Sequence, residues 1–121
     1  ADGIAADLGP SPTDANAGRL WEVDVFLRYG LSRRALAHAR ALVRAVPFRV
    51  EARLKLHEAY LACDSIEGAV HSLLVASDLA TLGGQQDAAV RALTRALDLA
   101  PGHPVLESAR IELGMPQPEG G

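Results

Sequence analysis

An interval of 34 residues recurs in the middle of this chain and constrains its fold more than any other feature. Three pairs of similar residues obey this interval: Phe26 and Tyr60, Leu27 and Leu61, and Ala35 and Ala69. An interval of this size is typical of a repeated helical hairpin. Such hairpins bury their apolar faces only by stacking on their neighbours, so we expect a binding surface rather than a reaction centre.

The composition favours closely packed helices in one small domain. The chain has 121 residues, of which 49% are hydrophobic and only 4% aromatic, and alanine is the most frequent apolar residue. Small side chains let helix axes approach closely, and alanine has the highest helix propensity. The sequence therefore predicts an all-α fold.

Apolar periodicity and turn residues divide the chain into six expected helices. Their approximate ranges are 17–29, 32–46, 49–63, 66–82, 86–100 and 104–113. Gly30 and Pro47 stand at the ends of the first two, and Asp64 and Glu67 have the spacing of a capping box before the fourth. Because the connections are short, consecutive helices should pack antiparallel.

The two ends of the chain differ from this middle part. Residues 1–16 contain glycine, proline and aspartate without an apolar period, and residues 114–121 contain two prolines and two terminal glycines. This composition is typical of linkers, so we expect a flexible linker at 1–16 and a flexible tail at 114–121. The helical domain should then span 17–113.

The residues at the 34-residue interval resemble the tetratricopeptide repeat (TPR) family. Its pattern of an aromatic residue in the first helix, an alanine entering the second and a proline after it is present as Phe26, Ala35 and Pro47. The second copy has Tyr60 and Ala69. The resemblance implies helical hairpins stacked as a short right-handed solenoid, with repeats at about 16–49 and 50–83.

The third unit, about 84–113, departs from the TPR pattern. Ala89 and Pro101 copy the second-helix signature, but Ala89 follows Ala35 by 54 residues instead of 68. Two interpretations are open. Either the segment 66–82 pairs with both of its neighbours, or a first helix is missing near Gly83.

The resemblance also implies a binding face for a peptide or helix of a partner protein. In this family the binding residues project from the first helix of each pair, and here these positions are Asp24, Leu27, Arg28, Leu54, Glu58 and Leu61. TPR proteins that capture C-terminal carboxylates have lysines and asparagines on this face. Asp24 and Glu58 stand in place of the asparagines and no lysine accompanies them, which argues against that specificity. Alternatively, the leucines belong to the core and the acids to a solvated face.

A run of basic residues gives a second candidate surface. Against the single acid Glu51, it contains Arg33, Arg34, Arg40, Arg44, Arg49, Arg53 and Lys55. Such a patch suits an acidic helix or a phosphorylated segment, although arginines also commonly solvate an exposed helix face. The net charge of −3 and the lack of interleaved aromatic residues argue against nucleic acid.

No pattern in the chain indicates catalysis, a metal site or a cofactor. His38, His57, His71 and His103 are scattered, and the thiolate form of Cys63 would be opposed by the charge of Asp64. We therefore expect a protein that is not an enzyme. No apolar run is long enough to cross a bilayer, so we expect no membrane insertion and a cytoplasmic location, with the periplasm as an open alternative.

Three functional hypotheses follow. The first is an adaptor or scaffold module within a larger bacterial protein or assembly, the arginine-rich and lysine-poor usage being typical of a GC-rich genome. The second is a regulatory domain of a bacterial transcription factor, because the segments 47–51 and 59–60 resemble the TPR-like activation domain of such regulators. The third is self-association through the irregular region 66–100.

Overall fold

The computed structural model describes residues 15–116, which form six helices and no strand. The helices are α2 (Ala15–Arg28), α3 (Ser32–Ala45), α4 (Val50–Ala62), α5 (Ile66–Leu82), α6 (Gln86–Leu99) and α7 (Pro104–Glu112). The all-α prediction is confirmed, and every helix bound lies within two residues of its predicted position. Residues 15 and 16, which were predicted as the end of the linker, belong to α2. The other residues of the predicted linker, 1–14, and residues 117–121 of the predicted tail lie outside the described residues.

The turns between helices follow from local backbone chemistry. Gly30 has φ 73° and closes α2 in the left-handed conformation that glycine adopts without strain. The capping box predicted at Asp64 is wrong by one residue. Ser65 is the N-cap of α5, where its Oγ accepts a hydrogen bond from the Gly68 amide at 3.3 Å. Asp64 occupies the turn with φ 60°, a conformation that aspartate tolerates better than most residues.

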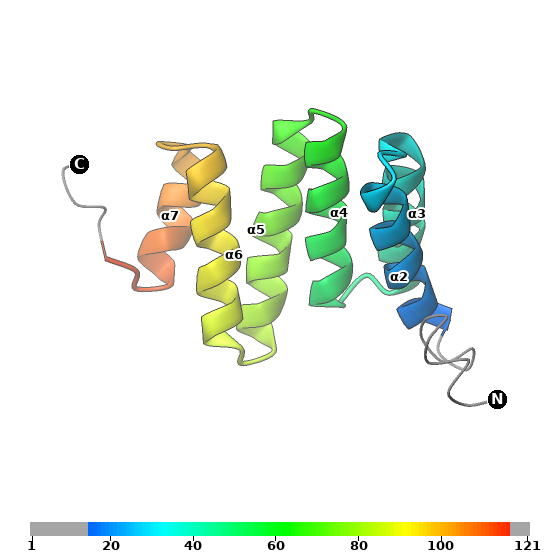
Figure 1. Cartoon of the computed structure of the whole chain (residues 1–121). Helices are drawn as coiled ribbons and strands as arrows, with labels where there is room; N and C mark the ends of the chain where they lie inside the picture. The colour runs from blue at the N-terminus through cyan, green and yellow to red at the C-terminus, as the bar shows by residue number, and fades with distance from the viewer. Residues whose placement is uncertain (1–14, 117–121) are drawn as a thin grey trace.

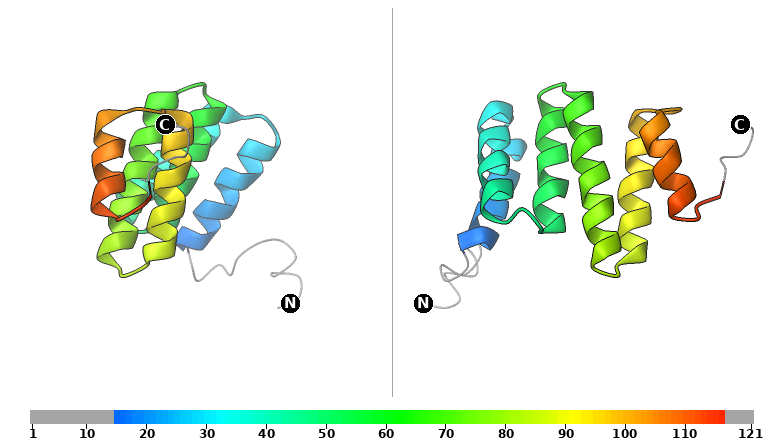
Figure 2. Two further views of the ribbon diagram at one scale, coloured as in Figure 1. Left: turned by 90° about the vertical axis from the view of Figure 1, so that its left-hand side faces the viewer. Right: turned by 180° about the vertical axis from the view of Figure 1, so that it is seen from behind.

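From α2 and α3, which overlap at one end of the view, the helices follow one another in chain order through α4, α5 and α6 to α7 at the other end (Figure 1). Each helix packs against the next, and α2 packs against α4 as well as α3. Seen from the α7 end, α7 lies at one side of the molecule, α2 at the other, and α6 between them (Figure 2, left). We call the side formed by α2, α4 and α6 the first-helix face.

Alanine and leucine residues of α3, α5 and α6 form a large part of the core. Ten of them are at most 1% exposed: Ala35, Ala39 and Leu42 in α3, Ala69, Leu73, Ala76 and Ala80 in α5, and Ala89, Leu93 and Ala96 in α6. The helices approach closely because alanine leaves little side chain between their axes. Ala89 of α6, which matches the second-helix pattern, is therefore buried in the core.

The position of α6 bears on the two interpretations of the irregular third unit. Helix α5 packs extensively against both α4 and α6, as in the first interpretation. A hydrogen bond of 2.9 Å from the Ser77 hydroxyl to the Ala89 carbonyl oxygen joins α5 to α6. Only the short turn of residues 83–85 separates the two helices, so α6 uses its alanine-rich face against α5 itself.

The last described residues fold back onto α7. Arg110 is only 4% exposed, and its guanidinium donates to Glu107 Oε2 at 2.8 Å and to the Met115 carbonyl oxygen at 3.3 Å. The Met115 amide in turn donates to the Arg110 carbonyl oxygen at 3.0 Å. The start of the predicted tail is therefore anchored to the helical domain.

Candidate functional site

Two of the predicted binding residues, one on α2 and one on α4, meet at a single lysine. Lys55 Nζ lies 2.5 Å from Asp24 Oδ1 and 3.3 Å from Glu58 Oε2. From the sequence we assigned Lys55 to the basic run with the arginines and expected no lysine beside Asp24 and Glu58. The structure corrects this, because Lys55 joins both carboxylates across the first-helix face.

The environment of Lys55 keeps its ammonium group charged. Partial burial alone would lower the pKa of Lys55, but the hydrogen bond to Asp24 and the negative charges of Glu58 and Asp24 raise it above its ordinary value. The single positive charge is shared by two carboxylates. In this ion cluster of Asp24, Lys55 and Glu58, the ammonium group of Lys55 is therefore already paired.

The other four predicted binding residues lie in different environments. Leu27 is half-buried against the apolar cluster around Val23, and Leu54 is half-buried against the cluster around Leu73. Leu61 is also half-buried, whereas Arg28 is exposed in the last turn of α2. Of the three leucines, Leu54 also lines a surface depression.

This depression, which we call the α4–α6 hollow, lies on the first-helix face beside the ion cluster. It has a volume of about 150 Å³ and is lined by Leu54, His57, Leu73, Ala88, Arg91, Ala92 and Arg95. Leu54, Leu73 and Ala92 supply apolar surface from α4, α5 and α6 respectively. Arg91 and Arg95 are exposed and stand one turn apart on α6. Within residues 15–116 neither guanidinium forms an ion pair.

His57 lies beneath these charges. It is 9% exposed, and its Nδ1 has no hydrogen-bond partner among the described residues. Burial lowers the pKa of His57 below its ordinary value, and the positive charges of Arg95 and Lys55 act in the same direction, against the Leu54 carbonyl and the Glu58 carboxylate. His57 is therefore neutral at pH 7 and adds no charge to the hollow.

The basic run predicted from the sequence is divided among separate environments. Arg40 donates to the Tyr60 hydroxyl from two nitrogens, each at 3.3 Å, and Arg49 pairs with Glu51 at 3.6 Å. Arg53 is half-buried, whereas all four arginines of α3 are exposed: Arg33, Arg34, Arg40 and Arg44. Lys55 belongs to the ion cluster. The run is therefore continuous in sequence, but several of its members already have partners within the domain.

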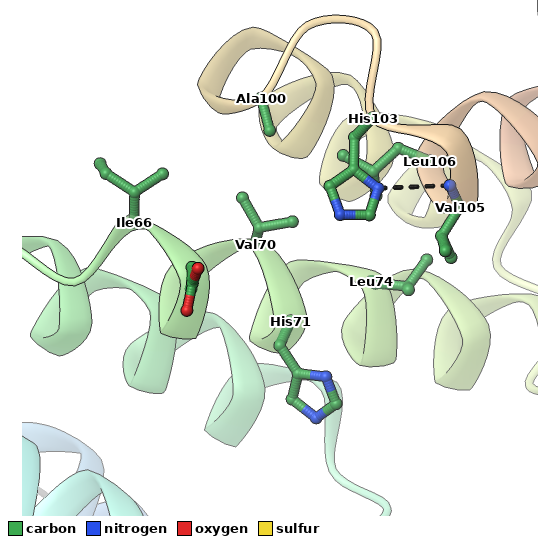
Figure 3. A pocket seen from close by; sticks show the side chains of 9 residues that line it. Ile66, Val70, His71, Leu74, Ala100, His103, Val105 and Leu106 are labelled. Carbon is green, nitrogen blue, oxygen red and sulfur yellow. Dashed lines mark hydrogen bonds between the residues drawn. The ribbon is translucent and has the colours of Figure 1, made fainter.

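A second depression, which we call the α5–α7 groove, lies between α5 and α7. Its volume is about 470 Å³, and its apolar lining consists of Ile66, Val70, Leu74, Ala100, Val105 and Leu106. Figure 3 shows the α5 residues on one side and those from the α6–α7 connection and α7 on the other. Glu67, His71 and His103 complete the lining, and His103 Nδ1 accepts a hydrogen bond from the Val105 amide at 3.2 Å. Ile66 and Val105 are 47% and 53% exposed.

The described part of the chain has neither a metal-binding cluster nor a membrane-spanning helix. Residues 15–116 contain no group of three or more histidines, cysteines or acids placed to hold a metal ion. In the same range, none of the helices combines the length and the apolar character that crossing a bilayer requires.

Comparison with known proteins gives no match from which a function could be taken. No protein-family model matches the chain, and no curated protein matches it either. Its function is therefore inferred from the two depressions and the ion cluster.

Proposed function

We propose that this chain is a protein-binding module built from TPR-like helical hairpins, which holds a peptide or helix of a partner protein on its first-helix face. The observation that carries the proposal is the α4–α6 hollow. It combines an apolar floor with two unpaired arginines, and it adjoins the Asp24–Lys55–Glu58 ion cluster. Apolar pockets with a few polar groups at their edge are the usual form of a peptide-anchoring site.

The packing of the first four helices supports the TPR-like assignment. Helix α2 contacts both its own partner α3 and the next first helix α4, as stacked hairpins require. Residues at the 34-residue interval have equivalent environments: Ala35 and Ala69 are fully buried, and Phe26 and Tyr60 pack against one apolar cluster. Asp24 and Glu58, also 34 residues apart, share Lys55.

Under this proposal the protein acts by binding and not by catalysis, as an adaptor or scaffold within a larger bacterial protein or assembly in the cytoplasm. An open hollow suits recognition of a segment better than enclosure of a reacting substrate. The ion cluster then fixes α2 against α4, so that the face is rigid before a partner arrives.

Selection from a displayed library of random short peptides tests the proposal. The wild-type chain should capture a related set of peptides, and Leu54→Asp should lose them because it places a charge in the apolar hollow. Leu82→Asp is the matched control: Leu82 is 84% exposed at the end of α5 and lies outside the hollow. Circular dichroism establishes that both variants are folded. Peptides that bind Leu54→Asp as well as wild type would contradict a site on this face.

The α5–α7 groove supports self-association as a second candidate function. Half-exposed Ile66 and Val105 border an apolar depression larger than the α4–α6 hollow. Sedimentation velocity over a range of protein concentrations should then show a dimer that Val105→Asp abolishes. A monomer at all concentrations would exclude this candidate without affecting peptide binding.

A further inference from the structure

On the first-helix face, Lys55 of α4 has carboxylate partners, whereas two arginines of α6 have none in the described part of the chain. On α2 and α4, Lys55 is held by both Asp24 and Glu58. On α6, Arg91 and Arg95 are exposed, and no carboxylate in the described part of the chain pairs with either. The two arginines are four residues apart, so their side chains project from the same side of the helix.

The arginines stand beside apolar surface instead of on an open polar surface. Both line the α4–α6 hollow together with Leu54, Leu73 and Ala92. Enclosed apolar cavities of about 150 Å³ hold one benzene-sized molecule, so a hollow of about 150 Å³ accommodates a single side chain. A ligand that fills it with an apolar side chain also brings its neighbouring residues next to two positive charges.

We propose that the partner segment is acidic: one aliphatic side chain enters the α4–α6 hollow, and flanking aspartates or glutamates pair with Arg91 and Arg95. This inference rests on the proposed function and names the chemical class of its ligand. Guanidinium groups bind carboxylates through paired, charge-assisted hydrogen bonds, and partial desolvation beside the apolar floor strengthens them.

The neutral state of His57 fits this division of roles. Burial and the nearby positive charge of Arg95 lower the pKa of His57, so that the ring carries no charge under the apolar anchor at pH 7. The positive charge of the hollow is therefore confined to the two arginines. The lining contains no phenylalanine, tyrosine or tryptophan on which a nucleotide base could stack, and His57 is only 9% exposed, which favours a peptide over single-stranded nucleic acid.

The experiment compares three forms of the full chain against the same displayed peptide library. Wild type should enrich peptides in which an aliphatic residue is flanked by aspartate or glutamate. Arg91→Glu/Arg95→Glu should bind these peptides at least about tenfold more weakly and enrich lysine and arginine instead. Arg91→Gln/Arg95→Gln, which removes the charge without reversing it, should show the same loss of affinity without the reversed preference.

Arg33→Glu/Arg34→Glu is the matched control, because Arg33 and Arg34 are two exposed arginines of α3 outside the hollow. It should select the same peptides as wild type. Enrichment of peptides without acidic residues, or an acidic preference that survives the Arg91 and Arg95 changes, would overturn the inference while peptide binding stands. Failure to enrich any peptide would instead contradict the proposed function. Single-stranded RNA that binds wild type but not Arg91→Glu/Arg95→Glu, without acidic peptides being selected, would overturn the inference in favour of nucleic acid.

Discussion

Lys55 Nζ lies 2.5 Å from Asp24 Oδ1, and this contact joins α4 directly to α2. The two residues are 31 positions apart in the chain, so the contact holds one hairpin against the next. Because Glu58 also pairs with Lys55, removal of the lysine leaves two carboxylates close together without a cation.

Lys55→Met should lower the free energy of unfolding by about 1 kcal/mol, the upper end of the range for partly exposed ion pairs. Urea denaturation measures this change. A double-mutant cycle with Asp24→Asn should give a favourable coupling energy between the two residues. Arg44→Met is the control, since Arg44 is exposed on α3, and it should have almost no effect. Zero coupling would show that the contact does not stabilise the pairing of α2 with α4.

Gly68→Ala should destabilise the protein by about 1–3 kcal/mol, the usual cost of overpacking. A Cβ at this position would lie 2.5 Å from the Tyr60 ring, which packs between α4 and α5. The control is Gly18→Ala in α2, where a Cβ would meet nothing within 4 Å. That substitution should stabilise by about 0.5–1 kcal/mol through helix propensity. Thermal unfolding of the two variants should therefore shift in opposite directions.

Ser77→Ala should cost about 0.5–1.5 kcal/mol, because it removes the hydrogen bond to the Ala89 carbonyl oxygen that joins α5 to α6. Thr81→Ala is the matched control. The Thr81 hydroxyl donates to the Ser77 carbonyl oxygen within α5 and lies on the exposed side, so its loss should change stability less. Equal effects of the two variants in chemical denaturation would show that the Ser77 contact adds nothing between the helices.

Acidification from pH 7 to pH 5 should destabilise wild type more than His57→Gln. In the folded state burial lowers the pKa of His57 below its ordinary value of 6.5, with smaller contributions from the charges of Arg95 and Lys55, against the opposite effects of the Leu54 carbonyl and the Glu58 carboxylate. The unfolded chain therefore binds more protons at this position as the pH falls below 6.5, and protonation favours unfolding. Urea denaturation across this range measures the difference. Identical pH dependence in the two proteins would contradict the assignment to His57.

The helices could be predicted from the sequence because their signals are local. Apolar spacing and turn residues such as Gly30 and Pro47 give the helix bounds within two residues. The capping error at Asp64 arose because aspartate serves equally well as an N-cap or as a left-handed turn residue, and only the backbone of the α4–α5 turn distinguishes the two.

The site could be predicted only in part. The 34-residue interval brought Asp24 and Glu58 to equivalent positions, and the three-residue spacing of Lys55 and Glu58 was a signal for the ion pair that was not used. Arg91 and Arg95 were missed because the repeat loses its phase before α6. The α5–α7 groove depends on how the short helix α7 sits against α5, which no local pattern in the sequence specifies.

The most direct test of the central claim is to map the binding surface by NMR, with an isotope-labelled full chain and one peptide from the library selection. We predict that the amide resonances that shift on titration cluster in α2, α4 and α6, with the largest changes around Leu54 and Arg91. Changes confined to residues 66–74 and 104–106 would place the peptide in the α5–α7 groove. They would contradict a binding site on the first-helix face.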